Sequence, residues 1–589
     1  MNRLIALLLA CLWATAAPPA AAQPQAQAAS AALRTLFSDE WERTLRDSPE
    51  TASYNGDVRY DDRWTDLSRP AIAAREAADR AALARLRSID RAALAPAERL
   101  QYDTFAWQLQ HAVDRQRFRE WLQPIGHQGG VQSADNIAEA MPFATGADYR
   151  RFMARIAALP TLVEQTIGLM RDGLRENALP PRVLMERVPA QITLQLVDDP
   201  TQSPFYRPFL KLPDTLPPAE RSALQAEAQA LIRSRVVPAY RALQTFVDAS
   251  YLPRTRSSIA ISDAADGKAH YDFLAGYYTT TDLDAATIHT IGLAEVARLR
   301  AAMERVKGEA GFGGSLGDFF THLRTDPKFF YPTPQALLDG YRATAKRIDP
   351  ELLKVFRTIP RLPYGVRGIP DNIAPASATG YYQGGAADGT RPGYLSVNLY
   401  RPEMRPRWEM LPLTLHEGVP GHHFQFARAL ELPNAPLLLK TAYFVAYGEG
   451  WALYAEKLGH DMGLYQDPYE RFGQLTYEMW RAVRLVIDTG IHSKGWSREQ
   501  AIAYFKDNAA KTELDIVNEV DRYIGMPGQA LAYKIGEMTI SALRERAQRE
   551  LGPRFDLRDF NDAVLATGSV PLAALQARIA EWIAERGAR

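Results

Sequence analysis

Cysteine is almost absent from this sequence of 589 residues, in which Cys11 is the only one. It lies in an N-terminal segment that we predict to be removed, so no thiol remains for disulfides, metal ligation or cysteine catalysis. An excess of charge is also absent, because 69 basic residues balance 69 acidic ones. Without a basic field, we expect neither a nucleic acid nor an anionic membrane as partner.

Long hydrophobic runs are missing from the chain after the N-terminal segment. No later segment contains the roughly eighteen consecutive apolar residues that a membrane span requires. The first residues, MNRLIALLLACLWATAAPPAAAQ, are typical of a secretory signal. We predict a signal peptide over residues 1–22, cleaved near Ala22, and a periplasmic or secreted protein. Lipoprotein anchoring at Cys11 is the weaker alternative, because the apolar region before that cysteine is very short.

Helical periodicity dominates the rest of the chain. Residues 23–30, QPQAQAAS, are interpreted as a short linker, and apolar residues then recur at helical spacing, for example over Glu220–Val247 and Ala285–Val306. Strand-like pieces are few, and no change of composition marks an independent domain. The sequence predicts one large, mainly α unit with lobes over residues 31–589, with its chemistry in residues 380–540. It gives no indication of the oligomeric state.

The segment LTLHEGVPGHHFQ (Leu413 to Gln425) carries three of the ten histidines. It resembles the helical zinc signature H-E-x-x-H, but Pro420 occupies the place of the second histidine. On a regular helix, six residues turn a side chain about 240° from His416, and seven residues add roughly 10 Å of rise. Neither His422 nor His423 therefore joins His416 at one ion if the helix is regular.

A bend at Pro420 removes this difficulty. Proline cannot donate to the carbonyl of His416 and its ring collides with that group, so the helix has to open there, while Gly421 supplies conformational latitude. If Pro420 and Gly421 are looped out, His422 becomes the second metal ligand and His423 lies beside the site, available to substrate. Glu417 then stands where such sites place the general base for zinc-activated water. A surface cluster of histidines at a kinked helix is the alternative.

A catalytic zinc requires a third protein ligand and one open position. The helical stretch YGEGWALYAEKLGHD (Tyr447 to Asp461) follows and offers Glu449 and Glu456 on one stripe. We expect Glu449 to be the ligand because its distance from His422 leaves room for a helix end, a loop and a return helix. Glu456 stays the alternative.

Further polar groups for a transition state or a substrate lie on both sides of these motifs. Arg484, Asp488 and His492 repeat at four-residue spacing amid apolar residues, as in a buried network or an ion-paired surface. Gly380 to Tyr400 reads as a β-hairpin, and its edge, with Tyr381 and Tyr382, either pairs with an extended peptide or forms a structural flap.

The motifs HEGVPGHHFQ, EGWALYAEKLG, RLVIDTGIHSKGWS and RYIGMPGQALAYKIG together resemble the bacterial family called domain of unknown function 885. Its members look like relatives of helical zinc peptidases such as thimet oligopeptidase and angiotensin-converting enzyme, with Pro-Gly inserted in the zinc helix. The resemblance implies a zincin-like fold with lobes around a cleft and a hairpin near the active site. It also implies that Tyr523 and Tyr533 stabilise an oxyanion and that Arg522 binds a substrate carboxylate.

One position departs from the pattern of the related peptidases, in which an acid four residues after the glutamate ligand often braces a histidine. That place is Leu453 here, so the bracing acid must come from elsewhere.

The leading hypothesis is a zinc hydrolase of oligopeptides. His416, His422 and Glu449 hold zinc, Glu417, Tyr523, Tyr533 and His492 serve catalysis, and His423, Arg484, Arg522, Tyr381 and Tyr382 contact the substrate. Hydrolysis of non-peptide amides or esters is one alternative, and a periplasmic metal- or peptide-binding protein without turnover is another. A pure binding site has no need of a carboxylate next to its first ligand, which favours the enzyme.

Overall fold

A computed structural model describes residues 22–370, 374–386, 389 and 391–588 of the chain. The predicted signal peptide lies outside this part except for Ala22. The described chain is mainly helical and contains one small sheet, as the periodicity predicts. Among the described residues, no helix combines the length and the hydropathy needed to cross a bilayer.

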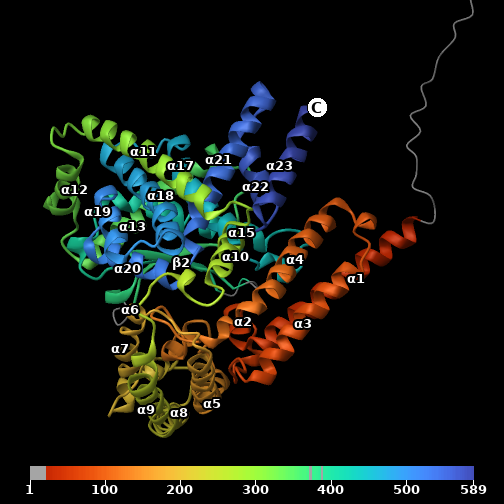
Figure 1. The fold of residues 1–589 in the computed structure, drawn as a ribbon, viewed down its shortest axis with the longest axis vertical. Helices are drawn as coiled ribbons and strands as arrows, with labels where there is room; N and C mark the ends of the chain where they lie inside the picture. The colour runs from red at the N-terminus through yellow and green to blue at the C-terminus, as the bar shows by residue number, and fades with distance from the viewer. Residues whose placement is uncertain (1–21, 371–373, 387–388, 390, 589) are drawn as a thin grey trace, which may run out of the picture.

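The first helices form an elongated arm at one side of the molecule (Figure 1). Residues 23–30, which we interpreted as a linker, are helical instead. Alanine and glutamine favour a helix, and Ala29 and Leu33 are buried in the apolar core of the arm with Leu83 and Phe105. The helices are α1 (Ala22–Asp47), α2 (Pro49–Tyr54), α3 (Arg69–Arg87) and α4 (Pro96–Arg115).

A second lobe follows the arm and has an apolar core of its own, with Phe152, Phe205 and Tyr240 among its fully buried residues. The predicted helix over Glu220–Val247 is divided here into two helices by a wider turn at Ile232–Val236, just before Pro238, which has no N–H to donate. The helices are α5 (Gly146–Glu176), α6 (Arg182–Met185), α7 (Val188–Thr193), α8 (Pro218–Leu231) and α9 (Val237–Phe246).

The remaining chain forms a helical body, coloured green to blue in Figure 1. Its longest helix, α18, is buried over most of its length and packs along α11. The helices are α10 (Gly267–Thr279), α11 (Ala285–Glu309), α12 (Leu316–Thr325), α13 (Pro334–Ile348), α14 (Met410–Glu417), α15 (His422–Leu430), α16 (Leu437–Lys440), α17 (Val445–Asp461), α18 (Pro468–Lys494), α19 (Arg498–Asn508), α20 (Glu513–Gly525), α21 (Ala532–Leu551), α22 (Leu557–Leu565) and α23 (Leu572–Gly587).

The sheet has three strands in the order β1-β3-β2. The predicted hairpin is formed by β2 (Gly380–Gln383) and β3 (Gly393–Val397), which pair antiparallel, and β1 (Tyr364–Gly368) pairs parallel to β3. Strand β2 contacts α14, so the hairpin lies beside the helix that carries His416. Its place near the histidines agrees with the prediction.

Two contacts fix the position of α17 within the body. A methyl group on Gly450 would lie 2.5 Å from the backbone of Gly536, so α17 and α21 touch glycine against glycine. At the other side, Leu439 of α16 is buried in the core of the arm, and Trp107 of α4 contacts Phe444 with ring centroids 5.2 Å apart. The arm therefore packs against the segment that connects α15 to α17.

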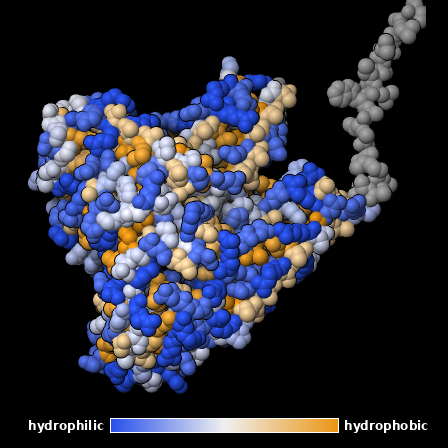
Figure 2. Space-filling view, in the orientation of Figure 1, coloured by the Kyte–Doolittle hydropathy of each residue, from blue (hydrophilic) through white to orange (hydrophobic). Residues whose placement is uncertain are grey.

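Hydrophilic residues cover much of the face shown in Figure 2, with hydrophobic ones scattered between them. This mixture agrees with the balanced and interspersed charges of the sequence.

Candidate metal centre

The helix of the histidine segment opens at the proline. Helix α14 ends at Glu417, the chain turns through residues 418–421, and α15 begins at His422. A methyl group on Gly421 would lie 1.9 Å from the carbonyl oxygen of His416, so only glycine fits this turn. The Trp451 indole donates to the carbonyl of Pro420 at 2.8 Å and ties the turn to α17. The predicted opening is present, as an interruption of four residues between two helices.

The turn brings the three expected ligands together. Imidazole nitrogens of His416 and His422 and a carboxylate oxygen of Glu449 all lie within 4.8 Å of one another. Glu449 Oε2 lies 3.3 Å from His422 Nε2 and 3.7 Å from His416 Nε2. Ligands about 2.0–2.2 Å from a tetrahedral zinc are roughly 3.3 Å apart, so this donor set fits the ion.

Glu456, the alternative ligand, lies behind His416 and does not join this group. Its Oε1 accepts a hydrogen bond from His416 Nδ1 at 2.8 Å, which leaves Nε2 facing Glu449. Seven residues make nearly two helical turns, so Glu456 returns to the face of Glu449. Glu456 is therefore the acid that holds His416 from behind by a hydrogen bond, a function that the position of Leu453 cannot serve.

The electrostatics of the group favour a cation. Burial opposes a charge on His416, but the nearby carboxylates of Glu449 and Glu456 raise the pKa of its imidazole to about 9. Burial opposes a charge on Glu449 as well, but His422 and His416 hold the pKa of its carboxyl well below the usual value. Among the described residues, His422 Nδ1 has no partner, so only one of the two histidines is braced.

Glu417 is the last residue of α14 and is half-buried. Its charge contributes to the raised pKa of His416 and also to that of Tyr443, a residue next to Glu449. The residue expected to act as general base thus directly follows the first of the three donors in the chain and is not one of them.

The comparisons with known proteins address the whole chain. A family model described as a bacterial protein of unknown function, DUF885, matches residues 49–579. The chain belongs to the DUF885 family. No curated protein matches it.

Solved structures share the fold of this DUF885 chain. One, described as "the putative lipoprotein from Colwellia psychrerythraea", is 27% identical with a TM-score of 0.89, over 94% of this chain and 99% of the other. Another, described as a "putative lipoprotein of unknown function from Shewanella oneidensis", is 18% identical with a TM-score of 0.69, over 92% and 99% of the two chains. The second likeness concerns the fold alone.

His423 lies beside the metal group of this DUF885 chain and contacts the hairpin. Its Nε2–H donates to the carbonyl of Leu362 at 3.0 Å, and its Nδ1 accepts from the Tyr382 hydroxyl at 3.0 Å. Burial lowers the pKa of His423 to about 4, so the ring is neutral. Tyr381 is adjacent to Tyr382 on β2 and points to the opposite face of the sheet. The structure thus brings His423 and Tyr382 together and separates Tyr381 from them.

The stripe on α18 is a buried network rather than a surface. Arg484 donates to the Tyr523 hydroxyl at 3.0 Å and to Glu519 at 2.9 Å, and Arg522 also donates to Glu519. The Tyr523 hydroxyl gives its proton to Glu519 at 2.7 Å. Tyr523 is almost fully enclosed, which leaves it poorly placed for the predicted oxyanion role.

Tyr533 contacts this network through its ring. Its ring is 4.3 Å from the guanidinium carbon of Arg484. Burial and then the charge of Glu449 raise the pKa of Tyr533. Of the two tyrosines that the resemblance implies, Tyr533 is half-buried, whereas Tyr523 is almost fully enclosed.

Both ring nitrogens of His492 form hydrogen bonds with backbone groups. Nδ1 accepts from the N–H of Ile261 at 3.1 Å, and Nε2 donates to the carbonyl of Tyr523 at 3.0 Å. Burial lowers the pKa of His492 to about 4. Asp488, one turn earlier, accepts from Tyr271 at 2.6 Å and from the N–H of Gly528. The two hydrogen bonds of His492 to the backbone indicate a structural role for this residue, in contrast to the catalytic role that we expected.

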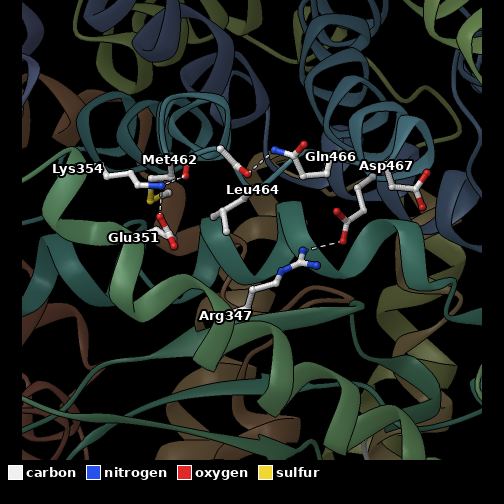
Figure 3. A pocket seen from close by; sticks show the side chains of 9 residues that line it. Arg347, Glu351, Lys354, Met462, Leu464, Gln466 and Asp467 are labelled. Atoms are coloured by element: carbon white, nitrogen blue, oxygen red, sulfur yellow. Dashed lines mark hydrogen bonds and ion pairs between the residues drawn. The ribbon is translucent and has the colours of Figure 1, made fainter.

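A cavity of about 410 Å³ lies at the other end of α17 and is a different site (Figure 3). Its charged side chains are paired, with Arg347 bonded to Glu470 at 2.7 Å and Lys354 to the carbonyl of Met462 at 3.0 Å. Met462 follows Glu449 by thirteen residues, which corresponds to about 20 Å along a helix.

Tyr443 and Trp451 are the site residues that the sequence did not single out. Tyr443 donates to Glu449, and Trp451 holds the turn at Pro420. Trp451 follows the Glu449 ligand by two residues within a quoted motif, which was an available signal. For Tyr443, which precedes that motif, the sequence offered none.

Glu456→Gln is expected to weaken zinc binding by about tenfold to a hundredfold, because removal of its charge makes His416 a poorer ligand. The shape of the buried side chain and an acceptor oxygen are retained. Competition with a chelator measures the affinity, and Glu550→Gln at an exposed ion pair of α21 is the matched control. Equal affinities in the two variants would contradict the bracing role.

Proposed function

We propose that this DUF885 chain is a zinc-dependent hydrolase that cleaves oligopeptides outside the cytoplasm. The observation that carries the proposal is the convergence of His416, His422 and Glu449, with Glu417 adjacent to the first ligand. Two imidazoles and one carboxylate are a ligand set of catalytic zinc, which needs three protein ligands and one open position. The proposal includes a zincin-like relationship and a cleft between the lobes.

A bound zinc ion would polarise the substrate carbonyl and lower the pKa of a coordinated water. Glu417 takes a proton from the attacking water and transfers it to the leaving nitrogen. Tyr533 is the donor assigned to the developing oxyanion, because of its coupling to Glu449. Glu456 keeps His416 in the tautomer that presents Nε2.

The preference for peptides over other amides rests on strand β2. Within the described chain, β2 pairs with β3 only, so its other edge has free backbone groups for an extended peptide. Its residue Tyr382 reaches His423, which immediately follows a metal ligand. Arg522 is the group assigned to an anionic end of the substrate, because its side chain is 15% exposed, whereas that of Arg484 in the same network is 4% exposed.

The location outside the cytoplasm rests on the N-terminal segment and on the structural relative from Colwellia psychrerythraea, whose description names a lipoprotein. In the proposed form, the signal peptide is cleaved near Ala22.

The purified mature protein is expected to retain about one zinc ion per chain, because the donor set describes a mononuclear site. Metal analysis after gentle dialysis measures this, and digestion of a peptide library identifies the products. The absence of a divalent metal would refute the proposal. One retained zinc without cleavage of any peptide, amide or ester would instead support a binding protein.

A further inference from the structure

Tyr443 precedes α17 and is bonded to a metal ligand. Its hydroxyl donates to Glu449 Oε1 at 2.8 Å, while the other oxygen, Oε2, faces His422 and His416 at 3.3 and 3.7 Å. The two carboxylate oxygens are thus assigned to different partners. One belongs to the tyrosine and the other to the group that would hold zinc.

Two helices fix the ring of Tyr443. A methyl group on Gly448 would lie 2.2 Å from its Cε2, so glycine is required where α17 passes the ring. The other contact is Phe426, whose ring stacks on it with centroids 5.5 Å apart and planes at 12°. Phe426 is one turn after His422 on α15, so Tyr443 lies between the helices that carry His422 and Glu449.

Exposure increases from the histidines toward Tyr443. The side chains of His416, His422 and Glu449 are 3%, 10% and 13% exposed, and Tyr443 is 37% exposed. The metal group therefore meets solvent on the side of Glu449 and Tyr443.

The geometry points to Tyr443 as a positioning residue of the metal centre, which restricts Glu449 to one ligand oxygen and keeps the fourth coordination position open. This inference rests on the proposed zinc site. A carboxylate binds a cation through one oxygen or through both, and an oxygen that already accepts a short hydrogen bond is a poorer ligand. The phenolic O–H of tyrosine is an ordinary hydrogen-bond donor at neutral pH.

Tyr443→Phe tests the inference because it retains the stacked ring and removes only the hydroxyl. Zinc affinity is expected to fall by about tenfold to a hundredfold, the usual effect of losing a partner of a metal ligand. In the cobalt-loaded protein, the intense visible bands of four-coordinate cobalt are expected to weaken toward a five-coordinate pattern as Glu449 binds through both oxygens. Competition with a chelator and visible absorption measure the two effects.

Tyr447→Phe is the matched control, because its hydroxyl donates to the carbonyl of Val564 at 2.9 Å and does not contact Glu449. A second variant, Gly448→Ala, displaces the ring of Tyr443 but retains its hydroxyl, and alanine favours the helix. We expect Gly448→Ala to reproduce both metal effects. This result separates positioning from a general loss of stability.

Identical affinity and absorption in Tyr443→Phe and Tyr447→Phe would overturn the inference and leave the proposed zinc site intact. Failure of the unaltered chain to bind zinc or cobalt would overturn both.

Discussion

Glu417→Gln is expected to lower peptide turnover by about 10²–10⁴-fold, the usual contribution of a general acid–base group. Glutamine retains the size and hydrogen bonding of the side chain but cannot accept a proton at neutral pH. Because Glu417 is outside the group of His416, His422 and Glu449, zinc content and peptide binding are expected to stay near those of the parent. Steady-state kinetics, metal analysis and calorimetric binding of a cleaved peptide measure these three properties.

The matched control is Glu403→Gln, an exposed glutamate in an ion pair with Arg401 that precedes the same helix. It is expected to retain full turnover. If Glu417→Gln cleaves peptides as fast as Glu403→Gln, Glu417 is not the base. A Glu417→Gln variant that also loses its zinc would show that the side chain supports the metal instead.

The second large effect concerns two adjacent histidines. His422→Ala is expected to abolish tight zinc retention, because it removes one of three protein ligands. His423→Ala is expected to retain zinc, because both ring nitrogens of His423 are bonded elsewhere, to Leu362 and Tyr382. Its effect is expected on substrate affinity or turnover, through the loosened hairpin. Metal analysis of the two variants after the same dialysis distinguishes them.

Each variant is the control of the other, because they differ by one position in α15 and are both buried. The reverse result, with zinc lost only in His423→Ala, would mean that the turn at Pro420 opens differently in solution. Loss of zinc in both variants would indicate that the start of α15 requires both rings for its structure.

Local sequence patterns predicted the opening at Pro420, since a proline four residues after His416 can neither bond to its carbonyl nor avoid it. They also predicted the hairpin, through the turn residues before Gly393, and the helical nature of the chain. The interpretation of residues 23–30 as a linker failed because a polar, alanine-rich segment forms a helix when one of its faces is buried, here in the apolar core of the arm. That core includes residues of α3, of α4 and of the distant α16.

The sequence by itself determined that the helix opens between His416 and His422, and it supplied the residue types of the proposed metal site, because these depend on spacing and on the chemistry of proline. Tertiary structure alone decided between Glu449 and Glu456, which share one face of α17. Glu449 faces Nε2 of His422, whereas Glu456 bonds to Nδ1 of His416. It likewise assigned structural bonds to His492, enclosed Tyr523 and brought Tyr443 to Glu449. The first and last of these outcomes depend on how α17 packs against α14 and α15, and those of His492 and Tyr523 on how α18 packs against α20. Residues far apart in the sequence set this packing, so no local pattern encodes it.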